Sequence, residues 1–331
     1  MNSVTAGGQL PYRDFIAQGL HYLTRTHSGV PTAEIISSAN WKGAALSPDQ
    51  ITWRFTAKQI AALEQRAEEI QLEGKSIAEV AASDFDIPAL AGFIRDWRQA
   101  LTDGAGVVLA KGLPVHSWGK RTASLVYWGI GHLLGKPGAQ NPQQELLGHV
   151  KDYREHHPEV RLYRTNAHIR FHCDPADVVG LLCLQPSASG GASRIASSVA
   201  IFNEIRRRDP QLAARLFKPF RMDRRGEETP GSRPWDLITP SCFDGATLRT
   251  FWHTDYFESV ARHQDVELTR EESTLIEWFE EIGNDPAFRL DMDFEAGDIQ
   301  LISNHSIVHG RTAYTDNDTS RHLLRLWLSL E

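Results

Sequence analysis

Two residues on one short segment, His172 and Asp174, have the side-chain types and the spacing of a pair of metal ligands. In a β-strand, residues i and i+2 point to the same face, so the imidazole and the carboxylate would project side by side while Cys173 points away. A third ligand could come from His309, in the distant segment GDIQLISNHSIVHGR. These three residues predict a metal site built from two histidines and one carboxylate.

This ligand set is typical of mononuclear non-haem Fe(II) oxygenases, in which three protein ligands occupy one face of an octahedron. Three coordination positions stay open, which leaves room for a bidentate 2-oxo acid and for O2. A His-x-Asp triplet also arises by chance in a chain with 14 histidines, and His253-Thr254-Asp255 has the same spacing. His253 and Asp255 therefore remain an alternative ligand pair.

Two arginines near the C-terminus could bind an anion beside such a metal. If RHLLRLWLSL is a strand, one of its faces carries Arg321, Leu323, Arg325 and Trp327. A guanidinium suits a 2-oxo diacid because the distal carboxylate is matched by a planar, bidentate donor. Ser193, in the turn SGGAS, could add a hydroxyl to the same carboxylate.

Short apolar runs between Gly, Pro and Asp-Asn turns are the elements that would hold these residues. The run GVVLAKGLPV (106–115) predicts a buried strand, and similar runs recur from about 158 onward, such as VVGLLCL (178–184) and DIQLIS (298–303). We therefore expect a mainly β fold with helical additions. Its core would be a double-stranded β-helix of the cupin-like, jelly-roll type, flanked by N-terminal and inserted helices.

Helical spacing predicts a first helix from Thr56 as N-cap to Gly74 as the stop. A second helix would run from an N-cap at Ser83 or Asp84 to 103–104, with Pro88 in its first turn. Further helices are expected at about 117–134, 199–217 and 270–282.

The start of the chain shows no such periodicity, so residues 1–55 are expected to form an irregular arm. We divide the chain into 1–103, an arm and helices packed on the core, and 104–331, the double-stranded β-helix core. Both parts should form a single structural unit.

The region from about 104 to the C-terminus resembles the taurine dioxygenase-like superfamily (TauD/TfdA) of Fe(II)/2-oxoglutarate oxygenases, which includes clavaminate synthase-type enzymes. The matching pieces, in the family's order, are GVVLAKGLPV, FHCD, SGGAS, NHSIVHGR and RHLLRLWL. The resemblance implies that His172, Asp174 and His309 bind iron at the catalytic centre.

The resemblance also implies residues for the co-substrate. Ser193 corresponds to a hydroxyl residue that touches the co-substrate, and Arg321 to the arginine that binds the distal carboxylate of 2-oxoglutarate. Arg325 matches a second arginine, which in relatives faces either the co-substrate or an anionic group of the substrate. The segment with His253 falls where relatives have a strand near the substrate mouth, so His253 is a candidate substrate contact.

Two polar residues of the segment TNAHIRFHCD are further candidate substrate contacts. Asn166 lies where polar residues of relatives often reach the substrate. An Asn in a loop can equally form hydrogen bonds to the backbone of its own turn. Arg170 shares a face with His172 in an extended strand and could bind a carboxylate; a salt bridge with a neighbouring acid is the competing interpretation. Together with Arg325 they favour a small polar substrate with a carboxylate or amino-acid group.

Composition excludes several classes of partner. Hydrophobic residues at 41% and charged residues at 23% are ordinary globular values, and a net charge of −7 argues against nucleic acid. No apolar run approaches the roughly 20 residues of a membrane helix. Three cysteines without CxxC spacing and a polar start indicate the cytoplasm. A homo-oligomer stays open.

The expected function is that of a dioxygenase that uses Fe(II), 2-oxoglutarate and O2 and releases succinate and CO2. It would hydroxylate, desaturate or cyclise an unactivated C–H bond of a small molecule, with secondary metabolism as the role by analogy with relatives. One alternative is a cupin-like metal-dependent hydrolase or isomerase that does not use 2-oxoglutarate. A non-catalytic small-molecule-binding barrel is the other.

Overall fold

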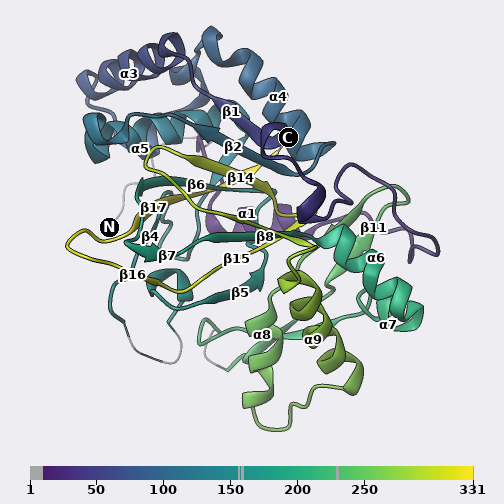
Figure 1. Ribbon diagram of the computed structural model, residues 1–331. Coiled ribbons are helices and arrows are strands. Elements are labelled where there is room, and N and C mark those ends of the chain that lie inside the picture. Colours follow the sequence, from purple (N-terminus) through teal and green to yellow (C-terminus); the bar gives the residue numbers. More distant parts are fainter. Residues whose placement is uncertain (1–9, 156, 158–159, 229–230, 331) are drawn as a thin grey trace.

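Two facing β-sheets form the centre of the fold (Figure 1). The computed structural model describes residues 10–155, 157, 160–228 and 231–330, so residues 1–9 of the expected arm lie outside the described part. The larger sheet has seven strands in the order β1 (Thr52–Arg54), β2 (Val107–Lys111), β14 (Ile299–Ser303), β6 (Val178–Gln185), β17 (His322–Ser329) and β3 (Lys136–Gly138), with β4 (Gly148–Val150) also on β17. The smaller sheet has four strands in the order β13 (Arg289–Met292), β8 (Ser193–Ser197), β15 (Ile307–Arg311) and β5 (Ile169–His172).

The chain crosses repeatedly between the two sheets. It passes from β5 in the smaller sheet to β6 in the larger and back to β8, and β13, β14, β15 and β17 repeat this alternation. This arrangement is a double-stranded β-helix, or jelly roll, so the expected fold class is confirmed. Three ribbons complete the strands: β9 (Phe220–Asp223) with β10 (Trp235–Ile238), β11 (Ser241–Phe243) with β12 (Leu248–Thr250), and β7 (Ser189–Gly190) with β16 (Tyr314–Thr315).

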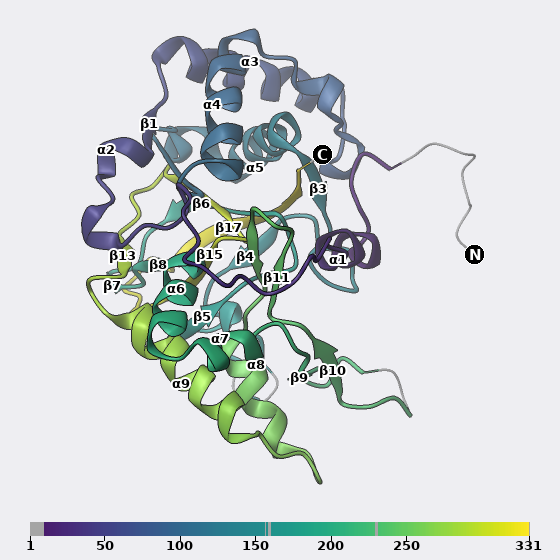
Figure 2. The same ribbon diagram turned by 90° about the vertical axis from the view of Figure 1, so that its right-hand side faces the viewer.

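Helices cover the outer faces of both sheets (Figure 1). α4 and α5 contact the larger sheet, and α6, α8 and α9 contact the smaller one. Figure 2 shows α1 at the edge of the larger sheet, where it contacts β17. The helices are α1 (Phe15–Leu23), α2 (Pro48–Ile51), α3 (Ala57–Leu72), α4 (Ala91–Thr102), α5 (Val115–Leu134), α6 (Ser198–Arg208), α7 (Pro210–Arg215), α8 (Thr254–Ser259) and α9 (Arg270–Asn284).

Three large apolar clusters hold these layers together. One joins α3, α4 and α5 to the larger sheet and contains Trp97 and Trp128. A second joins the smaller sheet to α6 and α9 and contains Trp252. A third lies between the two sheets and contains Ile302 and Trp327. The strands are therefore buried on both faces, which explains their nearly continuous apolar sequences.

β17 confirms the expected alternation of its two faces. Leu324, Leu326 and Leu328 belong to the cluster under the helices. Trp327 belongs to the cluster between the sheets. Arg325 is buried on that inner side, where it contacts Asp174. The strand itself begins at His322, so Arg321 lies just before it.

The first predicted helix is confirmed and the second begins later than predicted. Thr56 caps α3 by accepting from the backbone N–H of Gln59. Asp84 does not begin a long helix, because its carboxylate accepts from the N–H of Ala81 and caps a short 3₁₀ turn, Ala82–Phe85. Pro88 begins a second 3₁₀ turn, and α4 follows at Ala91.

The expectation of an irregular arm is wrong for several of the described residues. α1 begins after Asp14, whose side chain accepts from the N–H of Ala17, and β1 pairs in parallel with β2. The buried residues of α1 are Gln18 and Tyr22, whereas Ile16 is 71% exposed. The apolar side chains of α1 therefore do not mark its buried face. For this reason the periodicity of hydrophobic residues in the sequence does not predict the helix.

Candidate functional site

The structure brings His172, Asp174 and His309 together at the inner side of the smaller sheet. His172 ends β5, His309 lies opposite it on β15, and Asp174 follows two residues after His172. One potential ligand atom from each residue lies within 4.8 Å of the other two. Antiparallel pairing of two distant strands thus creates the cluster that the sequence predicted as a metal site.

Both histidines of this cluster have a ring nitrogen available as a metal ligand. The Nδ1 atom of His172 lies 3.0 Å from the carbonyl of Arg170, which favours a proton on Nδ1 and a free lone pair on Nε2. Burial, and then the nearby His172, lower the pKa of His309 to about 3, so its imidazole is neutral. The Nε2 atom of His309 lies 3.8 Å from an Asp174 carboxylate oxygen.

Asp174 is a buried carboxylate that stays ionised. Burial alone would raise its pKa, but Arg325, followed by His172 and His309, outweighs this effect and lowers the pKa to about 2. The Nη1 atom of Arg325 lies 3.3 Å from Oδ2 of Asp174, and the indole N–H of Trp327 donates to the same oxygen at 3.1 Å. Two imidazoles and one carboxylate are a donor set that fits Fe(II).

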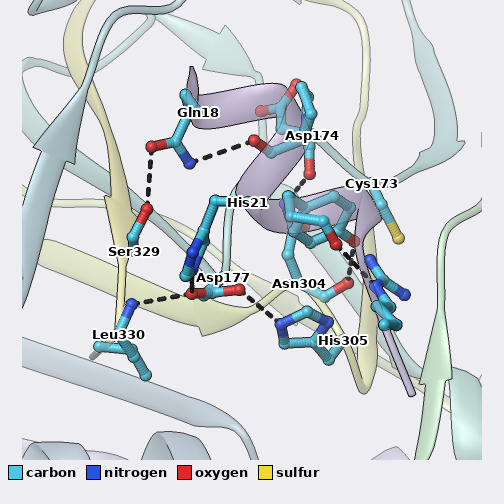
Figure 3. Close-up of polar contacts among 12 residues, drawn as sticks. Gln18, His21, Cys173, Asp174, Asp177, Asn304, His305, Ser329 and Leu330 are labelled. Atoms are coloured by element: carbon cyan, nitrogen blue, oxygen red, sulfur yellow. Dashed lines mark hydrogen bonds and ion pairs between the residues drawn. The ribbon is translucent and has the colours of Figure 1, made fainter. Parts of the chain in front are cut away.

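Helix α1 and Asn304, which directly follows β14, support the loop that carries Asp174 (Figure 3). Asn304 donates from its side-chain amide to the carbonyl of Asp174, and Gln18 donates to the carbonyl of Pro175 at 3.2 Å. The hydroxyl of Tyr22 donates to the carbonyl of Asn304 at 2.9 Å. Because Gln18 and Tyr22 both lie on α1, this helix is connected to the backbone of a predicted metal ligand.

Asp177 anchors the other end of the same loop (Figure 3). Its carboxylate lies 2.8 Å from a ring nitrogen of His21 and 2.7 Å from one of His305, and it accepts from the N–H of Leu330 at 2.8 Å. Burial raises the pKa of Asp177, but the hydrogen bond from His305 and the other contacts lower it to about 2. The loop is therefore tied to α1, to the segment after β14 and to the C-terminal end of β17.

A cavity extends from the three clustered residues to the predicted co-substrate residues. Its lining includes His172, Asp174, His309, Ser193, Arg311, Arg321 and Arg325. The hydroxyl of Ser193 donates to the side-chain carbonyl of Gln300 at 3.0 Å. Arg321 is 3% exposed, and its Nη1 atom is buried without a partner in the described part of the chain. We call this space the metal cavity.

Gly191 lets Arg321 approach the turn of the SGGAS segment. This glycine has φ +75°, and an added Cβ would lie 2.8 Å from the Ser187 hydroxyl oxygen and 3.1 Å from Nε of Arg321. Nη2 of Arg321 donates to the carbonyl of Gly191 at 3.4 Å. A residue without a side chain is therefore needed here for both the turn and the packing of the arginine.

Sequence reasoning missed Arg311, which shares the metal cavity with Arg321. Arg311 is 5% exposed, and its Nη2 atom donates to the carbonyls of Thr165 and Ala167. Its Nε and Nη1 atoms are buried without partners among the described residues. Burial, and then the nearby Arg321, lower the pKa of Arg311 to about 10. The signal was present, because Arg311 follows His309 by two residues and so shares its face in a strand.

The structure does not assemble the alternative ligand pair. His253 lies beside the cluster, with its ring centroid 5.1 Å from that of His172, but Asp255 lies 3.6 Å from Arg170 in an ion pair. The strand of relatives is present here only in part: His253 forms a single antiparallel bridge with His172, and α8 begins directly after it. The buried hydroxyl of Thr254 donates to the carbonyl of Phe171, which holds the chain where the helix begins. His253 stacks on Tyr256 at 3.6 Å.

The two weaker substrate candidates do not line the metal cavity. Arg170 forms ion pairs with Glu258, Asp255 and Glu280, as the salt-bridge interpretation predicted. Asn166 is exposed, and its backbone carbonyl accepts from the N–H of Tyr314 at 3.1 Å. A role of either side chain in substrate binding remains a prediction.

Known proteins resemble this chain in both sequence and structure. The model of a family described as taurine catabolism dioxygenase TauD, TfdA family, matches residues 71–327. FR-33289 synthase from Streptomyces rubellomurinus is 27% identical over 302 residues, which cover 88% of this chain and 89% of the relative. Uridine-5'-phosphate dioxygenase from an Amycolatopsis species is 26% identical over 217 residues, or 58% of this chain and 74% of the relative.

Solved structures with the same fold include two oxygenases. An asparagine oxygenase in complex with Fe(II), 2S,3S-3-hydroxyasparagine and succinate superposes with a TM-score of 0.68 at 17% identity, covering 84% of this chain and 93% of that chain. The non-haem iron oxygenase OrfP, in complex with Fe and alpha-ketoglutaric acid, superposes with a TM-score of 0.61 at 14% identity, covering 85% and 94%. Among the described residues, no helix has the length and apolar character to cross a bilayer.

Proposed function

The chain belongs to the TauD/TfdA family of dioxygenases, and from this premise we propose that it oxidises an unactivated C–H bond of a small polar molecule. It uses Fe(II), 2-oxoglutarate and O2 and releases succinate and CO2. His172, Asp174 and His309 hold the metal. The observation that carries this proposal is one cavity lined by the three ligand side chains and by Arg321, whose buried Nη1 atom has no partner among the described residues.

The protein's own groups bind and orient the co-substrate. Arg321 pairs with the distal carboxylate of 2-oxoglutarate, because a buried cation without an acidic partner gains most from a charged hydrogen-bond acceptor. Ser193 turns its hydroxyl hydrogen from Gln300 toward the same carboxylate. The iron and its co-substrate supply the oxidising chemistry, while the protein supplies ligands, orientation and exclusion of water.

Arg325 has a different role from Arg321. Its guanidinium already contacts Asp174 and Gln140, so it keeps the metal-binding carboxylate ionised and oriented. It also lines the metal cavity, where it can contact an anionic group of the substrate at the same time. Arg325 is therefore proposed as a link between the metal ligand and the substrate.

The proposed substrate carries a carboxylate or an amino-acid group. Solved structures of the same fold were determined with hydroxyasparagine and with hydroxyarginine, which supports an amino-acid-like substrate class. The arginines of the metal cavity supply the complementary charge. Hydroxylation is the default outcome, and desaturation or ring closure is open to the same chemistry. A cytoplasmic enzyme of secondary metabolism remains part of this proposal.

The test is anaerobic addition of Fe(II) and then 2-oxoglutarate to the purified protein. We expect a weak visible charge-transfer band from the chelated 2-oxo acid. His172→Ala should abolish the band and Arg321→Ala should weaken it, because these variants remove a ligand and the carboxylate partner, respectively. His253→Ala should keep it, since His253 is not among the clustered ligand residues.

Two results would change the assignment. A band that is lost in His253→Ala but kept in His172→Ala would move the metal to the alternative pair. Folded, iron-loaded wild-type protein without any band would instead favour a cupin-like hydrolase or isomerase, which has no use for 2-oxoglutarate.

A further inference from the structure

A second and much larger cavity lies next to the loop that carries the metal ligand Asp174. It has a volume of about 850 Å³ and includes His21, Arg25, Arg98, Asp177, Arg249 and His305 in its lining. None of its lining residues lines the metal cavity. Sites for small molecules are typically about 300–1,000 Å³, so this space is large enough for a whole ligand. We call it the rear cavity.

The rear cavity contains three arginines that form no ion pair with its two acids, Asp103 and Asp177, among the described residues. Arg25, Arg98 and Arg249 all line it, and none has a carboxylate within 4.0 Å in the described ranges. Arg25 stacks on the ring of Tyr22 at 4.1 Å and donates from Nε to the carbonyl of Tyr22 at 2.8 Å. Its Nη2 atom is buried and has no hydrogen-bond partner among the described residues. A buried guanidinium nitrogen without an acceptor is costly, and a bound anion would supply that acceptor.

His305 adds a second unpartnered atom on the same cavity. One ring nitrogen lies 2.7 Å from the Asp177 carboxylate, while Nδ1 is buried and makes no hydrogen bond to any described residue. Burial, together with Arg25 and Arg249, lowers the pKa of His305 to about 4 against the opposing effect of Asp177. Both guanidinium groups therefore act on one imidazole from different elements.

Asp177 does not neutralise these arginines. Its two carboxylate oxygens already contact His21, His305 and the N–H of Leu330, and no ion pair joins it to an arginine within the described residues. A second acid, Asp103, also lines the cavity; its carboxylate accepts from the hydroxyl of Thr102 at 3.0 Å and forms no ion pair with an arginine of the described part. Other lining residues include hydroxyls, such as Thr247 and Ser303, and apolar side chains, such as Leu101 and Val199. The cavity thus offers charge, hydrogen bonds and an apolar surface together.

From this arrangement we propose that the rear cavity is a second binding site, separate from the metal, for a small organic molecule that carries a phosphate group. Arg25 and Arg249 bind the phosphate, the hydroxyls of Thr247 and Ser303 add hydrogen bonds, and the apolar lining holds the organic part. A tetrahedral anion fits better than a planar carboxylate, because the donors reach it from separate segments and not from one guanidinium fork. The site does not depend on the function proposed for the metal cavity.

The test is calorimetric titration of the full-length protein with inorganic phosphate, compared with sulfate and acetate. We expect phosphate and sulfate to bind and acetate to bind at least tenfold more weakly. Arg249→Gln should weaken phosphate binding at least tenfold, because it removes one of the two proposed phosphate-binding cations. The variant should fold, since the Arg249 side chain is only partly buried and makes no hydrogen bond to another side chain or to the backbone in the described ranges. Arg95→Gln is the matched control, since Arg95 is an exposed arginine paired with Asp96 outside both cavities.

Two further variants separate this site from the metal site. His309→Ala should leave phosphate affinity unchanged, whereas Arg25→Gln should weaken it tenfold or more if circular dichroism shows a folded protein. If Arg25→Gln does not fold, Arg249→Gln decides the question. The proposal is overturned if wild-type protein does not bind phosphate, if Arg249→Gln binds it normally, or if His309→Ala abolishes binding.

Discussion

Single residues in the metal cavity create an excess of positive charge. Arg311, Arg321 and Arg325 line it, and Asp174 is the only carboxylate among the described lining residues. Arg325 is paired with Asp174, but Arg311 and Arg321 keep buried guanidinium nitrogens that no described residue accepts from. An anion that enters this cavity can pair with these buried guanidinium groups. The cavity should therefore favour anionic ligands over neutral ligands of similar shape.

Arg311 is expected to contribute to the binding of 2-oxoglutarate. Arg311→Gln should weaken 2-oxoglutarate binding by about tenfold or more, because a hydrogen bond to a charged group contributes about 1.5–3 kcal/mol. The affinity is measured anaerobically from the charge-transfer band during titration with 2-oxoglutarate. Arg194→Gln is the control, since Arg194 pairs with Asp291 and does not line the metal cavity. Equal affinities in the two variants would show that Arg311 does not contact the co-substrate.

Among the elements, α1 matters more for the site than its position in the chain indicates. It precedes residues 71–327, which the family model matches, and it still contacts the loop of the proposed metal ligand Asp174 through Gln18 and His21. Tyr22 adds a hydrogen bond to the carbonyl of Asn304. A helix that packs through polar side chains holds its neighbour by directional hydrogen bonds. Such bonds restrict orientation more than apolar contacts of the same area.

The prediction for α1 concerns metal affinity. Gln18→Ala removes the hydrogen bonds to Pro175 and from Ser329, at 3.2 and 3.0 Å, and should weaken Fe(II) binding several-fold. Each such hydrogen bond contributes about 1 kcal/mol to the stability of the fold. Without these bonds the Asp174 carboxylate is held less firmly in its orientation, which weakens metal binding. Fe(II) titration under argon measures the effect, with Ile16→Ala on the exposed side of the same helix as control. If both variants bind iron like the wild type, α1 only adds stability.

For the whole molecule, the parts expected at 1–103 and 104–331 share one set of layers. β1 pairs with β2, α4 packs on the larger sheet, and α1 contacts β17, so strands and helices of the first part complete the second. Tryptophans lie in each of the three large clusters, at Trp128, Trp252 and Trp327. Their fluorescence therefore reports on the whole structure.

This arrangement predicts a single unfolding transition. Tryptophan fluorescence and far-ultraviolet circular dichroism should give the same midpoint in urea, because no layer can separate without exposing a shared cluster. Saturating metal should shift both midpoints equally. Two resolved transitions, or a shift in only one signal, would mean that the first part unfolds independently of the core.

Much of the fold could be predicted from local patterns. The β-branched runs at 106–115, 178–184 and 298–303 became strands, because strands buried on both faces need continuous apolar sequence. Thr56 began a helix because its cap needs only the residues that follow it. α1 could not be predicted in this way, since its buried positions are Gln18 and Tyr22 and only the tertiary environment makes them suitable.

The sequence by itself determined the residue types of the candidate site and their order, because the period of a strand places His172 beside Asp174 and Arg321 near Arg325. Tertiary structure alone decided which His-x-Asp pair meets His309, because this depends on the pairing of β5 with β15. It also decided that Arg325 pairs with Asp174, that Arg311 joins Arg321, and that the rear cavity exists. Contacts between segments more than a hundred residues apart depend on sheet register and layer packing, which no local pattern encodes.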